Sequence, residues 1–314
     1  MLLNQMFEIK YPVIQGAMAN IATAEFAASV SNAGGLGVIG TGAMNVEQAR
    51  EAIRKCRSLT DKPFGVNVMM MNPYTKELME MIAEEKVALV TTGAGNPGVY
   101  MKMLKESGAR VFPVVPSVAM AIRMERSGAD GLIVEGGEAG GHVGEQTTMA
   151  LLPQVVDAVH VPVVAAGGIA DSRGFAAALC LGAIGVQVGT CLLVSEECPI
   201  HENYKNAVIK AKDTDTVVTG RSLNSPVRIL KNPMSRQYIK LEAEAASRDE
   251  LEKLTLGGLR RAVFEGDMKT GSVMMGQIAG LCKTIRPLKD ILASLVSDVP
   301  AVLAHAQQEL EESR

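Results

Sequence analysis

The ten residues from Glu135 to Gly144 place one histidine, His142, among five glycines. Because glycine has no side chain, such a segment lets a flat or charged ligand lie directly against the backbone. His142 is the group in this segment whose ordinary pKa suits proton transfer near neutral pH. A tight turn with a hydrogen-bonding histidine is the simpler alternative, and the other motifs of the chain must decide between the two. We take His142 as the candidate catalytic residue.

Other glycines, amides and small residues follow short apolar runs elsewhere in the chain. Because the carboxyl ends of parallel strands converge on one mouth of a barrel, segments far apart in the sequence are expected to form one site there. The cofactor-binding residues predicted at these ends are Gly16, Ala17, Met18, Asn67, Thr92, Glu135, Gly140, Gly141, Ala166, Gly167, Gly168, Gln187, Gly189 and Thr190.

Eight apolar runs must position these residues. They begin about 21 to 30 residues apart, the spacing of βα units, and are continuously apolar, as in strands buried on both faces. Ser117 is expected to begin a helix that Gly128 ends. Asp171 is expected to begin another that ends at Gly182. Eight such units predict an α/β fold, the (β/α)8 or TIM barrel. The predicted strands are Pro12–Gly16, Leu36–Gly40, Phe64–Val68, Ala88–Thr92, Val111–Val115, Leu132–Glu135, Pro162–Ala166 and Gly185–Gly189.

The regular pattern stops after the eighth run. A charged helical pattern without a strand run follows, and an apolar helix is expected to begin at Ser272. Loops after the strands emerge at the catalytic mouth, so this insertion would cover the site. We predict a barrel over residues 1–198, a helical cap inserted between strand 8 and helix 8 over 199–269, and a return to helix 8 and a C-terminal helix over 270–314.

The expected ligand is a flavin. Gly167-Gly168 and Gly189-Thr190 follow predicted strands 7 and 8, where barrels commonly bind a phosphate through backbone N–H groups and a helix N-terminus. Gly271-Ser272 would begin that helix. The amides of Asn67 and Gln187 can meet the polar edge of a ring across the mouth. Phosphate site, amides and glycines together suit flavin mononucleotide, FMN.

Two Gly-x-Gly-x-x-Gly matches raise the alternative of a dinucleotide-binding fold. The match at 35–40 lies inside a predicted strand, and the one at 93–98 is followed by a strand that ends without the acidic residue needed to hold a ribose. We therefore set this fold aside.

Composition bounds the class of protein. The chain has 314 residues, 47% of them hydrophobic and 21% charged, which predicts a large ordered core. No signal peptide or run long enough to cross a membrane is visible, and a net charge of −3 gives no overall attraction to nucleic acid. The five cysteines have no metal-ligand spacing, so we expect no metal site built from them and a cytoplasmic location.

Positive charge is concentrated in residues 201–240, which hold eight Lys and Arg against three Asp and Glu. Either this stretch is an ordinary solvated surface, or it docks an acidic protein partner. We expect Lys205, Lys210 and Lys212 to be exposed there.

The motifs resemble the nitronate monooxygenase superfamily of FMN barrels, and within it the chain is most similar to the bacterial enoyl-acyl carrier protein reductase II family. Ala17 stands where this family usually has glycine, Cys191 where arginine is common, and Leu223–Ser225 where histidine is frequent. The last two departures bear on substrate recognition rather than on flavin binding. The segments that carry the resemblance are Pro63–Asn67, Thr91–Gly95, Glu138–His142, Ala165–Asp171, Gln187–Thr190, Val217–Ser222, Pro226–Asn232 and Gly271–Gly280.

The resemblance implies FMN as cofactor, NADH or NADPH as reductant, a monovalent cation as a further requirement, an enoyl thioester on acyl carrier protein as substrate, and a homodimer. It adds Met274, Gly276 and Gln277 to the predicted cofactor-binding residues. His142 would donate a hydrogen bond or a proton to the thioester, and Glu135 would be a flavin ligand. Two alternatives stay open: nitronate oxidation on the same flavin, and a non-catalytic barrel that binds a phosphate ligand.

Overall fold

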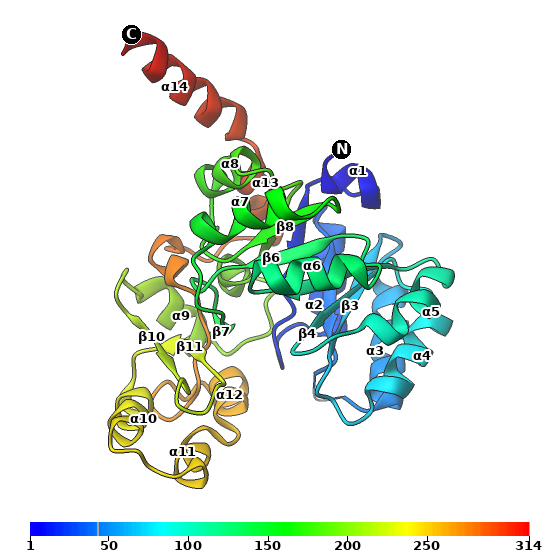
Figure 1. The fold of residues 1–314 in the computed structure, drawn as a ribbon. Helices are drawn as coiled ribbons and strands as arrows, with labels where there is room; N and C mark the ends of the chain where they lie inside the picture. The colour runs from blue at the N-terminus through cyan, green and yellow to red at the C-terminus, as the bar shows by residue number, and fades with distance from the viewer. Residues whose placement is uncertain (43, 314) are drawn as a thin grey trace.

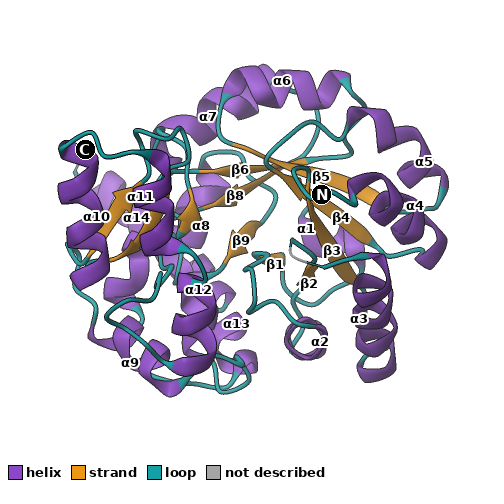
Figure 2. Ribbon diagram, turned by 90° about the horizontal axis from the view of Figure 1, so that it is seen from below, coloured by secondary structure: helices purple, strands orange, loops and turns teal. Residues whose placement is uncertain are grey.

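The structure is a computed structural model that describes every residue except 43 and 314. Eight parallel strands form a sheet in the order β1-β9-β8-β6-β5-β4-β3-β2, and a bridge between Ile14 and Leu36 brings its two edge strands together. The predicted (β/α)8 barrel is confirmed. Helices curve around the outside of the strands (Figure 2). The strands are β1 (Val13–Gln15), β2 (Gly37–Gly40), β3 (Phe64–Met69), β4 (Leu89–Gly93), β5 (Arg110–Val115), β6 (Leu132–Glu135), β8 (Val163–Ala166) and β9 (Val186–Val188).

Capping side chains set the predicted helix starts. Ser117 accepts a hydrogen bond from the backbone N–H of Met120 and begins α6, and Asp171 accepts two at the start of α8. Gly128 and Gly182 follow the ends of these helices with positive φ, as a left-handed C-terminal turn requires. The barrel helices are α2 (Ala24–Asn32), α3 (Val46–Leu59), α4 (Thr75–Glu85), α5 (Met101–Glu106), α6 (Val118–Arg126), α7 (Thr148–Ala158), α8 (Ser172–Cys180) and α13 (Leu288–Val296).

The core has an inner and an outer layer, because successive side chains of a strand point to opposite faces. Leu89, Phe112 and Ile133 belong to the cluster inside the barrel, whereas neighbouring residues such as Val90 belong to the cluster under the helices. The N-terminal helix α1 (Leu3–Phe7) adds two buried side chains to the inner cluster and packs Phe7 edge-on against Phe112. This helix therefore closes one end of the barrel interior.

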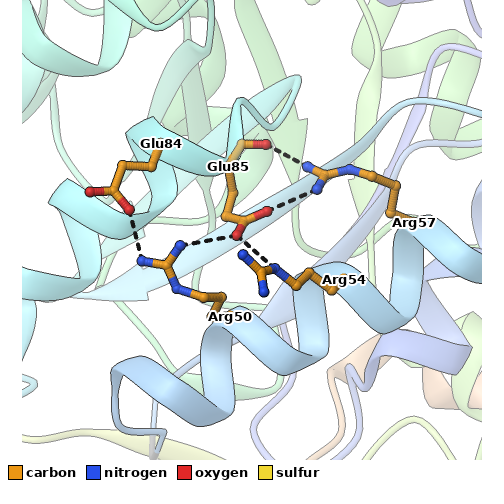
Figure 3. Close-up of polar contacts among 5 residues, drawn as sticks. All are labelled: Arg50, Arg54, Arg57, Glu84 and Glu85. Atoms are coloured by element: carbon orange, nitrogen blue, oxygen red, sulfur yellow. Dashed lines mark hydrogen bonds and ion pairs between the residues drawn. The ribbon is translucent and has the colours of Figure 1, made fainter.

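An ion-pair network joins α3 to α4 on the outside of the barrel (Figure 3). Arg50, Arg54 and Arg57 of α3 all donate to the carboxylate of Glu85, whose side chain is only 7% exposed. Arg50 also reaches Glu84 at 2.7 Å. The network links two neighbouring helices that also bury apolar side chains in the same core cluster.

The insertion contains strands as well as helices, and the expectation of a purely helical cap was wrong. Two strands, β10 (Thr216–Thr219) and β11 (Val227–Leu230), pair antiparallel, and β11 also pairs with the two-residue strand β7 (Gly141–His142). β-Branched residues favour these strands, but their short length and the interrupting Arg228 hid them in the sequence. The helices of the insertion are α9 (Glu202–Lys210), α10 (Pro233–Ala243), α11 (Arg248–Thr255) and α12 (Gly258–Arg260). The last three lie at the lower left in Figure 1.

No helix begins at Ser272, contrary to expectation. The chain runs extended there, and Met274 forms a bridge with Ile229 of β11. A 3-10 helix, η4 (Gln277–Leu281), starts only after Gly276. The last helix, α14 (Val299–Glu312), projects from the body with Val299 as its buried residue (Figure 1). Among the described residues, no helix combines the length and apolar character needed to span a bilayer.

Candidate active site

A cavity of about 310 Å³ lies where the carboxyl ends of the strands meet. Its lining combines glycines, a few polar side chains and several apolar ones, the usual composition of a small-molecule site. The structure brings most of the predicted site residues together there. Those that line the cavity are Gly16, Ala17, Met18, Asn67, Glu135, Gly140, Gly141, His142, Ala166, Gly167, Gly168, Gln187, Gly189, Thr190 and Met274.

Thr92 does not line the cavity, and its prediction as a cofactor-binding residue is corrected. Inward and outward positions alternate along β4, and Leu89 belongs to the inner cluster while Val90 belongs to the outer one. Thr92 therefore faces outward with Val90. The threonine that faces inward is Thr91, whose hydroxyl accepts a 2.9 Å hydrogen bond from the side chain of Asn67.

Gly276 and Gln277 lie behind the lining rather than in it. The backbone N–H of Gly276 donates to the hydroxyl of Thr190, and that of Gln277 donates to the carbonyl of Glu138, both at 2.9 Å. A Cβ on Gly276 would stand 2.6 Å from the carbonyl oxygen of Glu138. These two residues thus tie the loop after β9 to the glycine-rich loop after β6.

The loops after β8 and β9 form a backbone cradle. Gly167 and Gly168 both have positive φ, and a Cβ on Gly167 would stand 3.0 Å from the carbonyl of Gly136. Among the hydrogen bonds of the described residues, none has the backbone N–H of Gly167, Gly168 or Thr190 as its donor. Free N–H groups converging on a cavity suit an anion such as a phosphate. The expected helix at Ser272 takes no part, since Ser272 is buried against Gly258.

Glu135 ends β6 and points into the barrel mouth on the same side as Ile133. It lines the cavity and receives no hydrogen bond from the other described residues. Burial raises the pKa of Glu135 to about 7, because the ionised carboxylate is poorly solvated there. Near neutral pH this side chain can therefore offer a carboxylic O–H to a ligand as well as accept a hydrogen bond.

His142 lies in β7, which the loop forms by pairing with β11 of the insertion. Its ring lines the cavity and is reachable from solvent, yet burial among the cavity walls lowers its pKa below the ordinary value. The imidazole is thus neutral at pH 7, with one N–H to donate and one ring nitrogen to accept.

Sequence reasoning missed part of the site. Glu138, which is not among the predicted site residues, lines the cavity and accepts hydrogen bonds from the backbone N–H and the hydroxyl of Thr148 at the start of α7. Leu259, from the insertion, also lines the cavity; nothing in its local sequence marks it. The other lining residues outside the prediction are Ala19, Ile21, Gly40, Gly42, Met69, Gly93, Ala94, Val114, Ala139, Ile169, Val188, Leu193, Met275 and Ile278.

Comparison with known proteins identifies the family. The model of the nitronate monooxygenase family matches residues 1–83 and 72–298. The chain belongs to this family. A probable nitronate monooxygenase of Staphylococcus aureus is 33% identical over 350 aligned residues, which cover 96% of this chain and 98% of the relative. Family and neighbours make the protein an oxidoreductase.

Two solved structures are similar to this one over nearly the whole chain. FabK from Thermotoga maritima is 46% identical, with a TM-score of 0.95 over 98% of both chains. Nitroalkane oxidase from Streptomyces ansochromogenes is 25% identical, with a TM-score of 0.86 over 96% of this chain and 99% of the other. The fold of the whole chain, insertion included, is therefore shared with both.

Proposed function

We propose that the protein is an FMN-dependent enoyl-acyl carrier protein reductase, which reduces the trans-2 double bond of enoyl thioesters with NADH or NADPH. The observation that carries the proposal is the likeness to FabK, at 46% identity and TM-score 0.95 over nearly the full length of both chains. The likeness to nitroalkane oxidase is lower on both measures. Because the likeness to FabK covers 98% of both chains, it includes the insertion as well as the barrel.

The residues present fit FMN. The free N–H groups of Gly167, Gly168 and Thr190 suit its phosphate. The inward carboxyl of Glu135 and the amides of Asn67 and Gln187 can meet the polar atoms of the ribityl chain and the ring. Family membership supports a flavin as well.

When bound, the flavin would accept a hydride from the reduced nicotinamide and pass it to the substrate. His142 is the group of this chain that can act on the thioester as negative charge develops on its oxygen. The neutral imidazole donates an N–H hydrogen bond there, and such acid–base assistance typically contributes about 10²–10⁴-fold in rate. The apolar walls exclude water from the reacting atoms.

Nitronate oxidation is the second candidate, and membership of the nitronate monooxygenase family favours it. In that reaction His142 would accept a proton from the substrate, and O2 would re-oxidise the flavin. The two reactions share the cavity and the histidine, so they are separated by substrate and not by the flavin site.

One experiment separates these readings. The purified protein is reduced anaerobically with NADH and, in parallel, with NADPH, and then mixed with a crotonyl thioester. Separately, the oxidised protein is mixed anaerobically with a nitronate. We expect FMN in the purified protein and re-oxidation by the enoyl thioester. Reduction of the oxidised flavin by the nitronate, with no re-oxidation of the reduced flavin by the thioester, would favour the second candidate. A colourless protein that takes up no flavin would mean a non-catalytic barrel.

Replacement of His142 by alanine tests its role. We expect His142→Ala to keep FMN and to be reduced by the nicotinamide at the wild-type rate, because the ring is assigned to the second half of the reaction. Re-oxidation by the enoyl thioester should slow by about 10²-fold or more. A wild-type rate of re-oxidation would remove His142 from the mechanism.

Acyl carrier protein as the partner is part of the same proposal. Lys205 cannot contribute to its docking, contrary to expectation, because this lysine is buried and its ammonium donates to the carbonyls of Ser195 and Glu196. Lys210 and Lys212 are exposed, as expected. Reversing both to glutamate should slow turnover of carrier-bound substrate more than that of a small thioester, and salt should do the same. Equal effects on both substrates would mean an ordinary solvated surface.

Two further expectations, a homodimer and a monovalent-cation requirement, stay predictions. Light scattering of the purified protein gives the oligomeric state. Turnover in sodium, potassium and ammonium salts at constant ionic strength tests the cation, and equal rates in all three would argue against it.

A further inference from the structure

The loop that carries His142 has little means of holding itself in place. Glycine loses more backbone freedom on ordering than any other residue, and this loop holds five glycines between Gly136 and Gly144. Its ordered part, β7, has two residues and pairs with β11 of the insertion. The position of His142 is therefore set by contacts from outside the loop.

Arg228 of β11 supplies one of these contacts, through a charged side chain. Its Nε and Nη2 both donate to the carbonyl oxygen of Gly137, at 2.9 and 2.8 Å, and its Nη1 donates to the hydroxyl of Thr216 at 3.1 Å. The same strand holds the other end of the loop, since Val227 pairs with His142 and the N–H of Val143 donates to the carbonyl of Pro226.

The charge of Arg228 is directed at a neutral group. The side chain is partly buried, burial lowers its pKa, and among the described residues no carboxylate lies within ion-pair distance of it. Glu138 and Arg221 are the charged neighbours that act on it at longer range. Charge-assisted hydrogen bonds are roughly twice as strong as neutral ones. A planar guanidinium also fixes the direction of the carbonyl it grips, which a lysine ammonium cannot do.

We propose that Arg228 is a positioning residue: by holding the carbonyl of Gly137 from the insertion, it sets where His142 stands over the cavity. The proposal rests on the proposed function for the chemistry of His142, but its geometric part does not. The insertion thereby takes part in the reaction without contributing a group to it.

Four variants test this. Arg228→Met removes the guanidinium group and roughly keeps the length of the side chain. Arg228→Lys keeps the positive charge but lacks the paired Nε and Nη2 donors. Thr216→Val removes the partner of Nη1 and leaves the grip on Gly137, and Arg221→Met removes an exposed arginine of the same hairpin. The last two are matched controls for loss of a hydrogen bond within the insertion and for loss of a charge.

We expect Arg228→Met to lower kcat for enoyl reduction about 10- to 100-fold, as a displacement of about 1 Å does in an active site, with bound FMN and the rate of flavin reduction unchanged. Arg228→Lys should recover only part of the loss, and both controls should stay within about 3-fold of wild type. Unchanged kcat in Arg228→Met, or a loss that follows flavin content or thermal stability in all four variants, would overturn the proposal.

A second readout does not depend on activity. The chain has four histidines, so the ring resonances of His142 can be assigned with His142→Ala as reference and titrated by NMR. Glu135 and Glu138 line the same cavity and are present in every variant. We expect the pKa of His142 to lie below its ordinary value in the wild type and to move towards that value in Arg228→Met, since the freed loop exposes the ring to water. If His142 titrates identically in the wild type and in Arg228→Met, the positioning role is overturned. If the titration shifts but the wild type does not reduce the enoyl thioester, only the proposed function is overturned.

Discussion

Between β1 and β2, the side-chain amide of Gln15 forms the hydrogen bonds to the backbone of Val38 that a neighbouring strand would otherwise form. Its Nε2 donates to the carbonyl of Val38 at 3.3 Å, and the N–H of Val38 donates to its Oε1 at 3.4 Å. Further back, the backbones of β1 and β2 still meet through hydrogen bonds between Gln15, Val13 and Leu36. The two strands thus separate towards the mouth, where Gly16 and Gly40 line the cavity.

We predict that Gln15→Met destabilises the barrel at this seam. Both residues are fully buried, so the variant leaves the N–H and the carbonyl of Val38 without partners. An unsatisfied buried group costs about 1–3 kcal/mol, and the long bonds place this case near the lower value. Urea unfolding should show a lower midpoint with an unchanged slope. Gln237→Met, on the exposed face of α10, is the control; equal midpoints for both variants would contradict the assigned role.

We predict that Glu85→Gln weakens the joint between α3 and α4 in a pH-dependent way. Burial alone would raise the pKa of Glu85, but hydrogen bonds from Arg57 and Arg54 outweigh it and lower the pKa. The stabilisation is therefore present above the unfolded pKa, about 4.3, and is lost as pH falls through the folded pKa. The arginines are 32% to 64% exposed, so we expect a loss of only about 1–2 kcal/mol in free energy of unfolding at pH 7.

The control for Glu85→Gln is the same substitution at the neighbouring residue, Glu84. Glu84→Gln removes a carboxylate whose side chain is 65% exposed and which binds Arg50 at the edge of the same network. Its effect on unfolding should be smaller than about 1 kcal/mol at every pH. A difference between wild type and Glu85→Gln that persists unchanged at pH 3 would show that the stabilisation does not come from the ionised carboxylate.

We predict that Glu135 makes FMN binding pH-dependent. A ligand that covers the cavity buries this carboxyl further, which disfavours its ionised form, so binding takes up a proton. Affinity should fall as pH rises through about 7 in the wild type and not in Glu135→Gln. Phosphate monoesters titrate near pH 6. Ionisation of the phosphate affects both proteins alike. The measurement is therefore the difference between wild type and Glu135→Gln in how FMN affinity, followed by fluorescence, depends on pH. The same pH dependence in both would assign it to another group.

We predict that Leu259 limits the acyl chain that fits the cavity. Among the described residues it is the one from the insertion that lines the wall. Its backbone is held in place, because Arg261 donates to the carbonyl of Leu256 and a Cβ on Gly258 would stand 2.6 Å from the hydroxyl of Ser272. The side chain therefore acts as a fixed wall, and shortening it enlarges the space beyond.

In Leu259→Ala, the ratio of kcat/KM for a ten-carbon over a four-carbon enoyl thioester should rise about 10-fold, the effect of adding space for a few methylenes. Leu256→Ala removes a leucine that is 79% exposed and does not line the cavity, and its ratio should equal that of the wild type. If both variants shift the ratio alike, the effect comes from the surface of the insertion.

The barrel and most of its mouth follow from local patterns. Eight apolar runs predicted the strands, and capping residues predicted the helices between them. Because the carboxyl ends of parallel strands meet at one mouth, Gly16, Gly167 and His142 could be assigned to one site from the sequence. Thr92 was misplaced because β4 is apolar on both faces, so alternation cannot show which threonine faces inward.

The insertion was less predictable because its order comes from contacts distant in sequence. The strand that contains Arg228 pairs with the nearby strand β10 and also with Gly141 and His142, far upstream. Lys205 was expected on the surface, yet its ammonium reaches two backbone carbonyls that a local pattern does not reveal. Where structure depends on such pairings, residue type alone cannot give burial.

The pairing of β1 with β9 also has a consequence for synthesis. Val13 pairs with Val186, and the N–H of Leu3 in α1 donates to the carbonyl of Ile184. On a ribosome that adds about 5–20 residues per second, the first strand waits roughly 9 to 35 s for its partner. During that time Leu3, Val13 and Ile14 lack partners that bury them in the folded barrel, so this segment exposes apolar side chains to which a chaperone can bind.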